Sequence, residues 1–310
     1  MAGLTHSAFR RLLSDYGGYG ALFTEMLSAR QILKEDLASS PYTRRSEKEG
    51  KVIYQLMVQD TDRLDEVIGR LATLNPEGLD INLACHAPKI RNVRAGSRLF
   101  DDAPALLRVL SEVRRCWPGL LTVKIRLGWE REGWQKLFVQ RLRVIEDAGV
   151  DAITLHPRFF EDKFKRRVRH EYMDWVVSKT RLPIIANGDL TGPESLKEFS
   201  PSMTKVSGFM FGRILMVKPW LFASMQREVA VEYFDVWGKL FEYISEDFPP
   251  DIAMERIKLF SIYYARNFQF GHSFANSIAN STSPQEIRDR AALFLKDTPN
   301  VLQHPSLQGL

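Results

Sequence analysis

The sequence has few cysteines and no long apolar run, and each absence excludes a class of protein. Only Cys85 and Cys116 occur among 310 residues, with no C-x-x-C pair and no Cys/His spacing typical of a zinc site. We therefore expect no disulfide framework, no bound metal, and a reducing, cytoplasmic compartment. The sequence contains neither a run of about 18 apolar residues nor a signal-peptide pattern, so no membrane association is expected.

Charge is distributed unevenly along the chain. The formal net charge is +5. Residues 229–310 carry seven Lys/Arg and ten Asp/Glu, whereas residues 1–228 carry 36 and 28. The excess of basic residues in 1–228 favours an anionic partner such as nucleic acid, although overall charge is weak support for one. Nothing in the composition demands more than a monomer.

Short apolar runs alternate with longer segments of helical periodicity. The predicted strands are 52–58, 79–84, 121–125, 152–155, 184–186 and 208–211, and the predicted helices are 62–74, 103–117, 134–148, 172–178, a short one from 194, and 216–230. An earlier apolar run, 21–23, leads into Thr24, Glu25 and Met26. Seven strand–helix pairs at this spacing predict a right-handed parallel βα array, either an eightfold barrel or an open doubly wound sheet.

The polar residues that follow these strands favour the barrel. No G-x-G-x-x-G follows a strand, which disfavours a dinucleotide-binding fold. Polar and glycine residues do cluster at the C-terminal ends of the strands: Gln55, Asn82 with Cys85, Lys124 with Arg126, His156 with Arg158, Asn187 with Gly188, and Gly212 with Arg213. A TIM-type (β/α)8 barrel brings such strand ends together on one face.

The alternation ends near residue 229, and helical periodicity at 252–266 and 284–295 follows, the latter behind Ser283 as a cap. The sequence therefore predicts two domains, a βα barrel at 1–228 and a small all-helical domain at 229–310.

The stretch from Gly78 to Phe100 holds the main catalytic candidate. Cys85 ends an alternating apolar strand and precedes a basic loop, which predicts a reactive thiol facing an anionic ligand. Two later motifs, Asn187-Gly188-Asp189 and Gly212-Arg213, follow the last two strands, where barrels often bind phosphate. An ordinary tight turn explains Asn-Gly as well.

Three further side chains are candidates for the site, and two of them have a second interpretation. Lys124 at a strand end is suited to stabilising negative charge on a flavin ring, or to pairing with a carboxylate. His156 is a candidate acid, or a core histidine with its hydrogen bonds satisfied. Gln55 is an amide in an apolar strand, and flavin edge atoms would supply the partners it needs.

Residues 158–169 combine six Lys/Arg with Phe159, Phe160 and Phe164. This mixture suits phosphate contacts and base stacking. A solvated loop with a few core aromatics explains the same composition.

Taken in order, these motifs resemble those of the tRNA-dihydrouridine synthases over essentially the whole chain. The resemblance is carried by MAGLTHSAFR at the start, TEM from Thr24, DINLAC ending at Cys85, VKIRLGW around Lys124, HPR from His156, IIANGD, and FGR followed by PWLF. It implies an FMN-binding βα barrel with a C-terminal helical domain that grips tRNA.

The resemblance also implies a reaction and its residues. NADPH, or NADH, would reduce FMN, hydride would pass to C6 of a tRNA uridine, and Cys85 would deliver a proton to C5. The implied cofactor-binding residues are Met1, Gln55, Lys124, His156, Asn187, Gly188, Asp189, Gly212 and Arg213. The implied substrate-binding residues are Asn82, Arg158, Arg166 and Arg167.

Three departures from the family pattern leave alternatives open. Ala84-Cys85-His86 replaces Gly-Cys-Pro, and His86 becomes a candidate proton relay. His156-Pro157-Arg158 replaces His-Gly or His-Ala-Arg. Met1 stands where the family's first strand ends, so we expect a truncated first strand. The alternatives are another FMN barrel reductase acting on a small pyrimidine or enone, and a catalytically impaired RNA-binding relative.

Overall fold

A computed structural model describes residues 1–162, 166–297 and 299–307, so Phe164 of the basic segment 158–169 lies outside the described residues. Contacts divide the chain into two compact units. The first comprises residues 1–25, 41–50 and 212–310, and the second comprises residues 26–40 and 51–211. The domain division at residue 228 stays a prediction.

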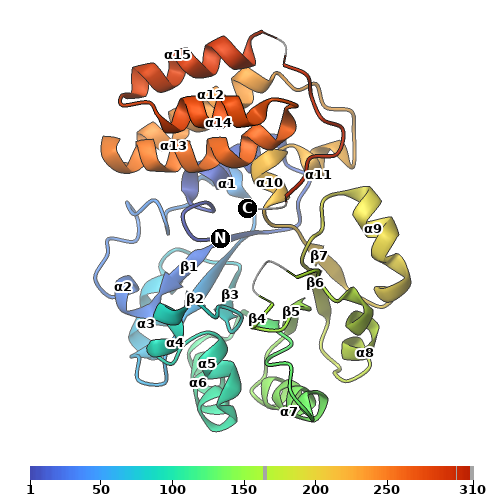
Figure 1. Cartoon of the computed structure of the whole chain (residues 1–310). Coiled ribbons are helices and arrows are strands. Elements are labelled where there is room, and N and C mark those ends of the chain that lie inside the picture. Colours follow the sequence, from blue (N-terminus) through green and yellow to red (C-terminus); the bar gives the residue numbers. More distant parts are fainter. Residues whose placement is uncertain (163–165, 298, 308–310) are drawn as a thin grey trace. The chain divides into compact units, whose positions relative to one another are not determined.

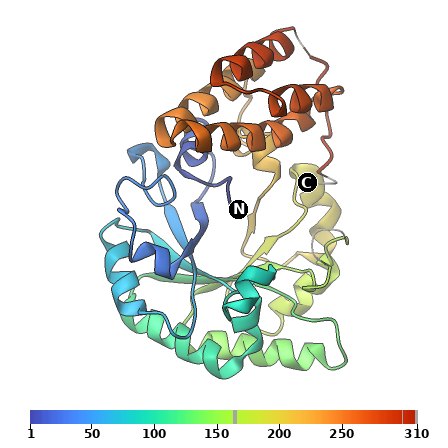
Figure 2. The same cartoon turned by 60° about the vertical axis from the view of Figure 1, so that its left-hand side comes forward.

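Parallel strands form the centre of the second unit (Figures 1 and 2). They are β2 (Val52–Met57), β3 (Gly78–Asn82), β4 (Leu120–Arg126), β5 (Ala152–His156), β6 (Ile184–Asn187) and β7 (Gly208–Met210). Each pairs in parallel with the next. With β1 (Leu22–Ser28), which leads from the first unit into the second, the described chain has a seven-stranded sheet in sequential order. The βα-barrel architecture is confirmed, and the described strands are one fewer than the eight of a complete TIM-type barrel.

Helices connect the strands of this sheet along the chain. They are α3 (Leu64–Ala72), α6 (Ala103–Cys116), α7 (Trp134–Asp147), α8 (Met173–Val177) and α9 (Pro193–Phe199), together with the short α2 (Ala29–Ile32), α4 (Pro88–Asn92) and α5 (Ser97–Asp101). Helix α6 begins where the Asp102 carboxylate accepts a hydrogen bond from the Ala105 amide at 3.1 Å, with Pro104 in its first turn.

Strand β3 is buried at all five of its positions, as expected for a strand covered on both faces. Its side chains alternate between apolar Leu79 and Ile81 and polar Asp80 and Asn82. Because alternate side chains point to opposite faces of a sheet, Asp80 and Asn82 share the face away from Leu79 and Ile81.

The first unit is mainly helical. Its C-terminal part consists of α12 (Tyr233–Asp247), α13 (Pro250–Tyr264), α14 (Gly271–Ala279) and α15 (Pro284–Leu295), which lie side by side (Figure 1). The N-terminal α1 (Ser7–Tyr16) packs against α12. The predicted cap is confirmed, because the Ser283 hydroxyl accepts a hydrogen bond from the Glu286 amide at 3.2 Å.

The single helix predicted at 216–230 is wrong. The chain forms α10 (Ile214–Val217) and α11 (Leu221–Ser224) instead. Lys218 between them has φ −122° and ψ 79°, because the ring of Pro219 disfavours helical geometry at the preceding residue.

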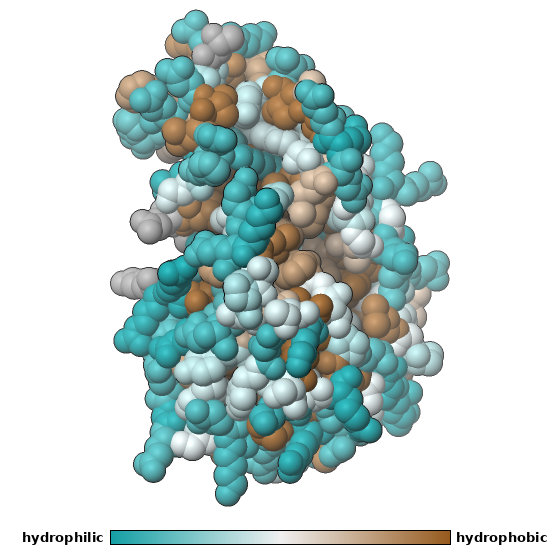
Figure 3. All heavy atoms as spheres, turned by 90° about the vertical axis from the view of Figure 1, so that its right-hand side faces the viewer, coloured by the Kyte–Doolittle hydropathy of each residue, from teal (hydrophilic) through white to brown (hydrophobic). Residues whose placement is uncertain are grey.

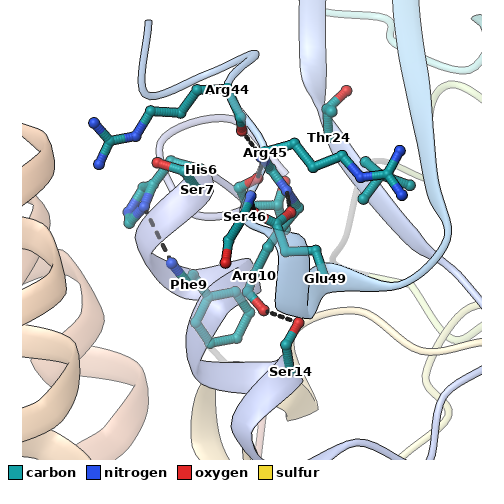
Figure 4. A network of polar contacts seen from close by, with 12 residues as sticks. His6, Ser7, Phe9, Arg10, Ser14, Thr24, Arg44, Arg45, Ser46 and Glu49 are labelled. Atoms are coloured by element: carbon teal, nitrogen blue, oxygen red, sulfur yellow. Dashed lines mark hydrogen bonds and ion pairs between the residues drawn. The ribbon is translucent and has the colours of Figure 1, made fainter. Parts of the chain in front are cut away.

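A buried ion pair joins α1 to residues 41–50 within the first unit (Figure 4). Arg10 Nε donates to Glu49 Oε2 at 2.6 Å, and the two side chains are 1% and 0% exposed. The remaining guanidinium nitrogens donate to the carbonyls of Thr5 and Arg44 at 3.0 and 2.6 Å. Glu49 Oε1 accepts from the Ser46 amide at 2.8 Å. Both charges are therefore compensated by several hydrogen bonds.

Candidate active site

The carboxyl ends of β2, β3 and β4 bring together four of the predicted site residues: Gln55, Asn82, Cys85 and Lys124. The strand register sets Asn82 directly opposite Lys124. One step deeper it sets Gln55 opposite Asp80, and Asp80 opposite Thr122. Two polar rows therefore cross the second unit's sheet below the cysteine loop.

Hydrogen bonds join Asp80 of the deeper row to Thr122 and Gln55 on its two sides. Asp80 is fully buried, and its carboxylate accepts from Thr122 Oγ1 at 2.6 Å and from Gln55 Nε2 at 2.7 Å. Burial raises the pKa of Asp80 to about 6, against the lowering effect of these two donors and of Lys124. The carboxylate is therefore mostly ionised at neutral pH.

Asn82 connects this row to the cysteine loop. Its Nδ2 donates to Gln55 Oε1 at 2.9 Å. Its Oδ1 accepts from the backbone amides of Ala84 and Cys85 at 3.2 and 2.9 Å. The turn that carries Cys85 is thus held by a side chain of the strand that precedes it.

The same turn is closed from its far side by Gly96. The Ser97 amide donates to the Cys85 carbonyl at 2.9 Å. Gly96 has φ 57°, and a Cβ there would stand 2.5 Å from the Cys85 carbonyl oxygen. Only glycine combines this backbone conformation with so close an approach. The Cys85 residue itself is partly exposed.

Lys124 is a half-buried cation with no direct partner among the described residues. Its ammonium makes no hydrogen bond or ion pair with any residue that the structure describes. Burial, reinforced by Arg126, lowers the pKa of Lys124 to about 8, while Asp80 and Cys85 oppose that shift. The site therefore holds a positive charge at neutral pH that is available to an acceptor from outside the protein.

His156 and Arg158, which follow β5, form a second cluster. Arg158 Nη1 donates to His156 Nε2 at 3.0 Å, so this imidazole nitrogen acts as an acceptor. Arg158 also donates to Asp189 Oδ2 at 2.7 Å and to the Arg166 carbonyl at 2.8 Å. With 2% exposure, Arg158 is enclosed by protein partners, and its predicted contact with substrate stays a prediction.

The loop after β6 approaches this cluster closely. Gly188 has φ 112°, and a Cβ there would lie 2.7 Å from His156 Cδ2. The Gly188 carbonyl accepts from His170 Nε2 at 3.0 Å. The preceding Asn187 turns its amide towards β7, donating to the Met210 carbonyl at 2.8 Å.

In the basic segment 158–169, a buried carboxylate lies next to exposed basic side chains. Asp162 is 1% exposed and accepts from the Phe159 amide at 2.9 Å and from Arg166 at 3.2 Å. The Arg166 and Arg167 side chains are 63% and 75% exposed, with Arg167 paired to Glu198. Both are available to a large ligand.

The remaining predicted residues belong to the first unit. Gly212 and Met1 lie together there, since a Cβ on Gly212 would stand 3.8 Å from Met1 Sδ. Arg213 precedes α10 as its N-cap residue. Their contribution to a phosphate site with Asn187, Gly188 and Asp189 stays a prediction.

His86 stacks on Phe160, with ring centroids 6.5 Å apart and an angle of 23° between the planes. Its role as a proton relay stays a hypothesis.

Three further observations concern the described chain as a whole. Hydrophilic residues cover much of the face in Figure 3, and hydrophobic residues gather there in separate patches. No helix within residues 1–162, 166–297 and 299–307 is long and apolar enough to cross a membrane. In the same ranges, no three His, Cys, Asp or Glu side chains are grouped so that they could hold a metal ion.

Sequence reasoning missed Asp80, Thr122 and Asp162. Asp80 carried a usable signal, because a carboxylate in the middle of an otherwise apolar strand requires buried partners. Thr122 carried none, since its partner Asp80 lies 42 positions away in the chain. Asp162 carried a local signal, because its partners Phe159 and Arg166 lie three and four positions away.

Comparisons with known proteins agree on one family. A family model described as dihydrouridine synthase matches residues 1–285. The tRNA-dihydrouridine synthase B of Shewanella oneidensis is 31% identical over 244 residues, which cover 77% of this chain and 72% of that protein. The protein of the same name from Pasteurella multocida is 29% identical over 226 residues, covering 73% and 67%.

A solved structure supports the fold alone. It is 6-hydroxypseudooxynicotine amine oxidase from Pseudomonas geniculata N1, with a TM-score of 0.50 and 14% identity over 75% of this chain and 47% of that one.

Proposed function

This chain belongs to the dihydrouridine synthase family, and we propose that it reduces the 5,6 double bond of a uridine in tRNA with FMN as cofactor and NADPH as reductant. The observation that supports this most is the position of Cys85, just after β3, next to the strand β4 whose Lys124 lies opposite Asn82 in the register. One residue supplies a proton and the other a positive charge, which are the two groups that a reductase of this kind needs.

The described side chains fit a flavin. Lys124 is a half-buried ammonium that lacks an acceptor among the described residues, and an anionic ring edge would provide one. The other candidates for holding the cofactor are Met1, Gln55, His156, Asn187, Gly188, Asp189, Gly212 and Arg213. When bound, FMN would accept hydride from the nicotinamide and deliver it to C6 of the uracil ring.

The chain itself would supply the proton and the orientation. The Cys85 Sγ would donate a proton to C5 of the uracil. Asn82 would contribute to holding the uracil edge while its Oδ1 keeps the Cys85 turn in place. Arg158, Arg166 and Arg167 are the proposed contacts to the RNA. The target base must leave its stack, which costs a few kcal/mol, less in a loop.

Purified protein tests the proposal directly. We expect a yellow protein whose flavin absorbance bleaches with NADPH and returns when unmodified tRNA is added, with dihydrouridine appearing in the tRNA. Colourless protein that still binds tRNA would contradict it and favour the catalytically impaired relative. Return of colour with a free pyrimidine or a small enone, but not with tRNA, would favour the other reductase.

We further propose that the protein is a monomer in the cytoplasm.

The charge on Lys124 predicts a pH dependence of flavin reduction. The lowered pKa of Lys124, about 8, means that its charge is present below that pH and is lost as the pH rises through it. The rate of flavin reduction by NADPH should therefore fall about tenfold between pH 7 and pH 9, following the protonated fraction. Stopped-flow absorbance measures this rate. Lys124→Met should be slow and flat over the same range, and a persisting inflection near pH 8 would contradict the assignment.

Arg166 and Arg167 predict a change in salt dependence of tRNA binding. Replacing both with alanine should reduce the slope of log affinity against log salt by about 0.7–0.9 for each phosphate that is no longer neutralised. Fluorescence anisotropy of labelled tRNA measures it. Arg115→Ala is the matched control, because Arg115 is 65% exposed and ion-paired at the end of α6 that leads into β4, opposite the carboxyl ends of the strands. Equal slopes for the double variant and the control would refute the assignment.

A further inference from the structure

The buried Asp80 carboxylate lies below the proposed reaction site, at one end of a line of hydrogen bonds that reaches the cysteine turn. Thr122 Oγ1 and Gln55 Nε2 donate to its two oxygens at 2.6 and 2.7 Å. An ionised carboxylate only accepts hydrogen bonds. Both neighbours must therefore present donors to it.

This requirement fixes the direction of the Gln55 amide. With Nε2 committed to Asp80, the amide oxygen must face the other way, and Oε1 accepts from Asn82 Nδ2 at 2.9 Å. Gln55 is 8% exposed. A reversed amide would set its oxygen against the carboxylate, and a buried pair of acceptors is strongly unfavourable.

The orientation of the Gln55 amide fixes the orientation of the Asn82 amide, which in turn holds the backbone of the cysteine turn. With Nδ2 committed to Gln55, the oxygen of Asn82 faces the chain ahead, where it accepts from the Ala84 and Cys85 amides. A reversed Asn82 would direct its NH₂ group at two backbone N–H donors. Three side chains from adjacent strands thus determine which way one turn is held.

We propose that Asp80 is a positioning residue for Cys85, acting by orienting the amides of Gln55 and Asn82 so that the oxygen of Asn82 holds the turn carrying the thiol. The inference rests on the proposed function for the role of the thiol. Asp80 itself lies below the reacting groups, and its effect on Cys85 passes through the two amides.

The charge of Asp80 has a second effect that must be separated from orientation. Asp80 favours the protonated form of Lys124, so any neutral substitution also weakens the positive charge in the site. Two neutral variants separate the effects. Asp80→Asn can keep its oxygen towards Gln55 and donate its NH₂ to the Thr122 hydroxyl, which is able to accept. Asp80→Leu has the same number of side-chain heavy atoms, branched at the same carbon, and removes the acceptor that fixes the direction of the Gln55 amide.

Amide hydrogen exchange at single-residue resolution tests the proposal without any cofactor. The Ala84 and Cys85 amides should exchange about tenfold faster in Asp80→Leu than in the wild type, because their acceptor is no longer fixed. Asp80→Asn should stay within about threefold of the wild type. The Leu83 amide donates to the Lys124 carbonyl at 2.9 Å, so it is an internal reference that should not change.

Two results would overturn the proposal. The first is wild-type exchange at Ala84 and Cys85 in Asp80→Leu. The second is equally fast exchange in the two Asp80 variants, because this would assign the effect to charge and not to orientation.

Substitutions of Thr122 keep the test available if Asp80→Leu does not fold. Thr122→Val removes one donor to the carboxylate and nearly conserves volume, whereas Thr122→Ser keeps that donor. Exchange at Ala84 and Cys85 should rise in Thr122→Val, by less than the tenfold expected above, and should match the wild type in Thr122→Ser. Equal exchange in these two variants would also count against the proposal.

Single-turnover reduction of uridine adds the functional comparison. With flavin reduced beforehand, Asp80→Leu should be about tenfold slower than Asp80→Asn. Equal rates would mean that the orientation of the turn does not serve the thiol. If wild-type protein fails to reduce uridine in tRNA, the proposed function is refuted while the exchange experiment still tests the orientation of the turn.

Discussion

Cys85→Ala should abolish dihydrouridine formation while leaving flavin reduction by NADPH within about twofold of the wild type. The expected loss in the uridine step is about 10²–10⁴-fold, the usual contribution of a positioned general acid. The thiol stands on a turn held by Asn82 and closed by Gly96, so removing Sγ should leave the backbone in place. The size of the loss then reports proton delivery by the thiol alone.

The measurement is single-turnover oxidation of prereduced protein by unmodified tRNA, followed by absorbance and by dihydrouridine content. Cys116→Ala is the matched control, because Cys116 is the other thiol of the chain and lies at the end of α6 with its Sγ near Glu112. It should be unaffected. Retained activity in Cys85→Ala, or equal losses in both variants, would rule out the acid role.

Arg10→Met should destabilise the protein by about 3–5 kcal/mol, the cost of leaving a buried charge without its partner. Glu49 is fully buried, and of the donors in the described part of the chain its carboxylate would then keep only the Ser46 amide at 2.8 Å. The carbonyls of Thr5 and Arg44 would also lose their donor. The free energy of unfolding is measured by urea titration with tryptophan fluorescence.

Two comparisons make this prediction specific. Arg288→Met removes an exposed ion pair with Glu242 in the same unit and should have little effect, as is typical of surface pairs. Replacing Arg10 and Glu49 together by apolar residues should cost less than the sum of the two single changes, because neither charge is then left alone. Additive losses would show that the pair is not coupled.

Some features of the site could be predicted because strand order alone sets them. In a parallel βα array every strand carries its last residues to the same face. Gln55, Asn82, Cys85 and Lys124 were therefore expected near one another, and the structure brings them together at the ends of β2, β3 and β4.

Sequence rules for helix ends were reliable where one contact between residues close in the chain determines the structure. Ser283 caps α15 as its position before Pro284 predicts. The same rules failed at 216–230, where apolar periodicity indicated one helix and the local effect of Pro219 on Lys218 divided it.

The sequence by itself determined the βα alternation, the family, and which residues stand at strand ends, because these depend on short-range periodicity and order. Only the tertiary structure decided which residues are partners in hydrogen bonds and ion pairs. Asp80 meets Gln55 and Thr122 only through the register of three strands, and Arg10 meets Glu49 across 39 positions. Hydrogen bonds and ion pairs between distant residues depend on distances that chain order does not specify. The orientation of the Cys85 turn is therefore a property of the packed sheet.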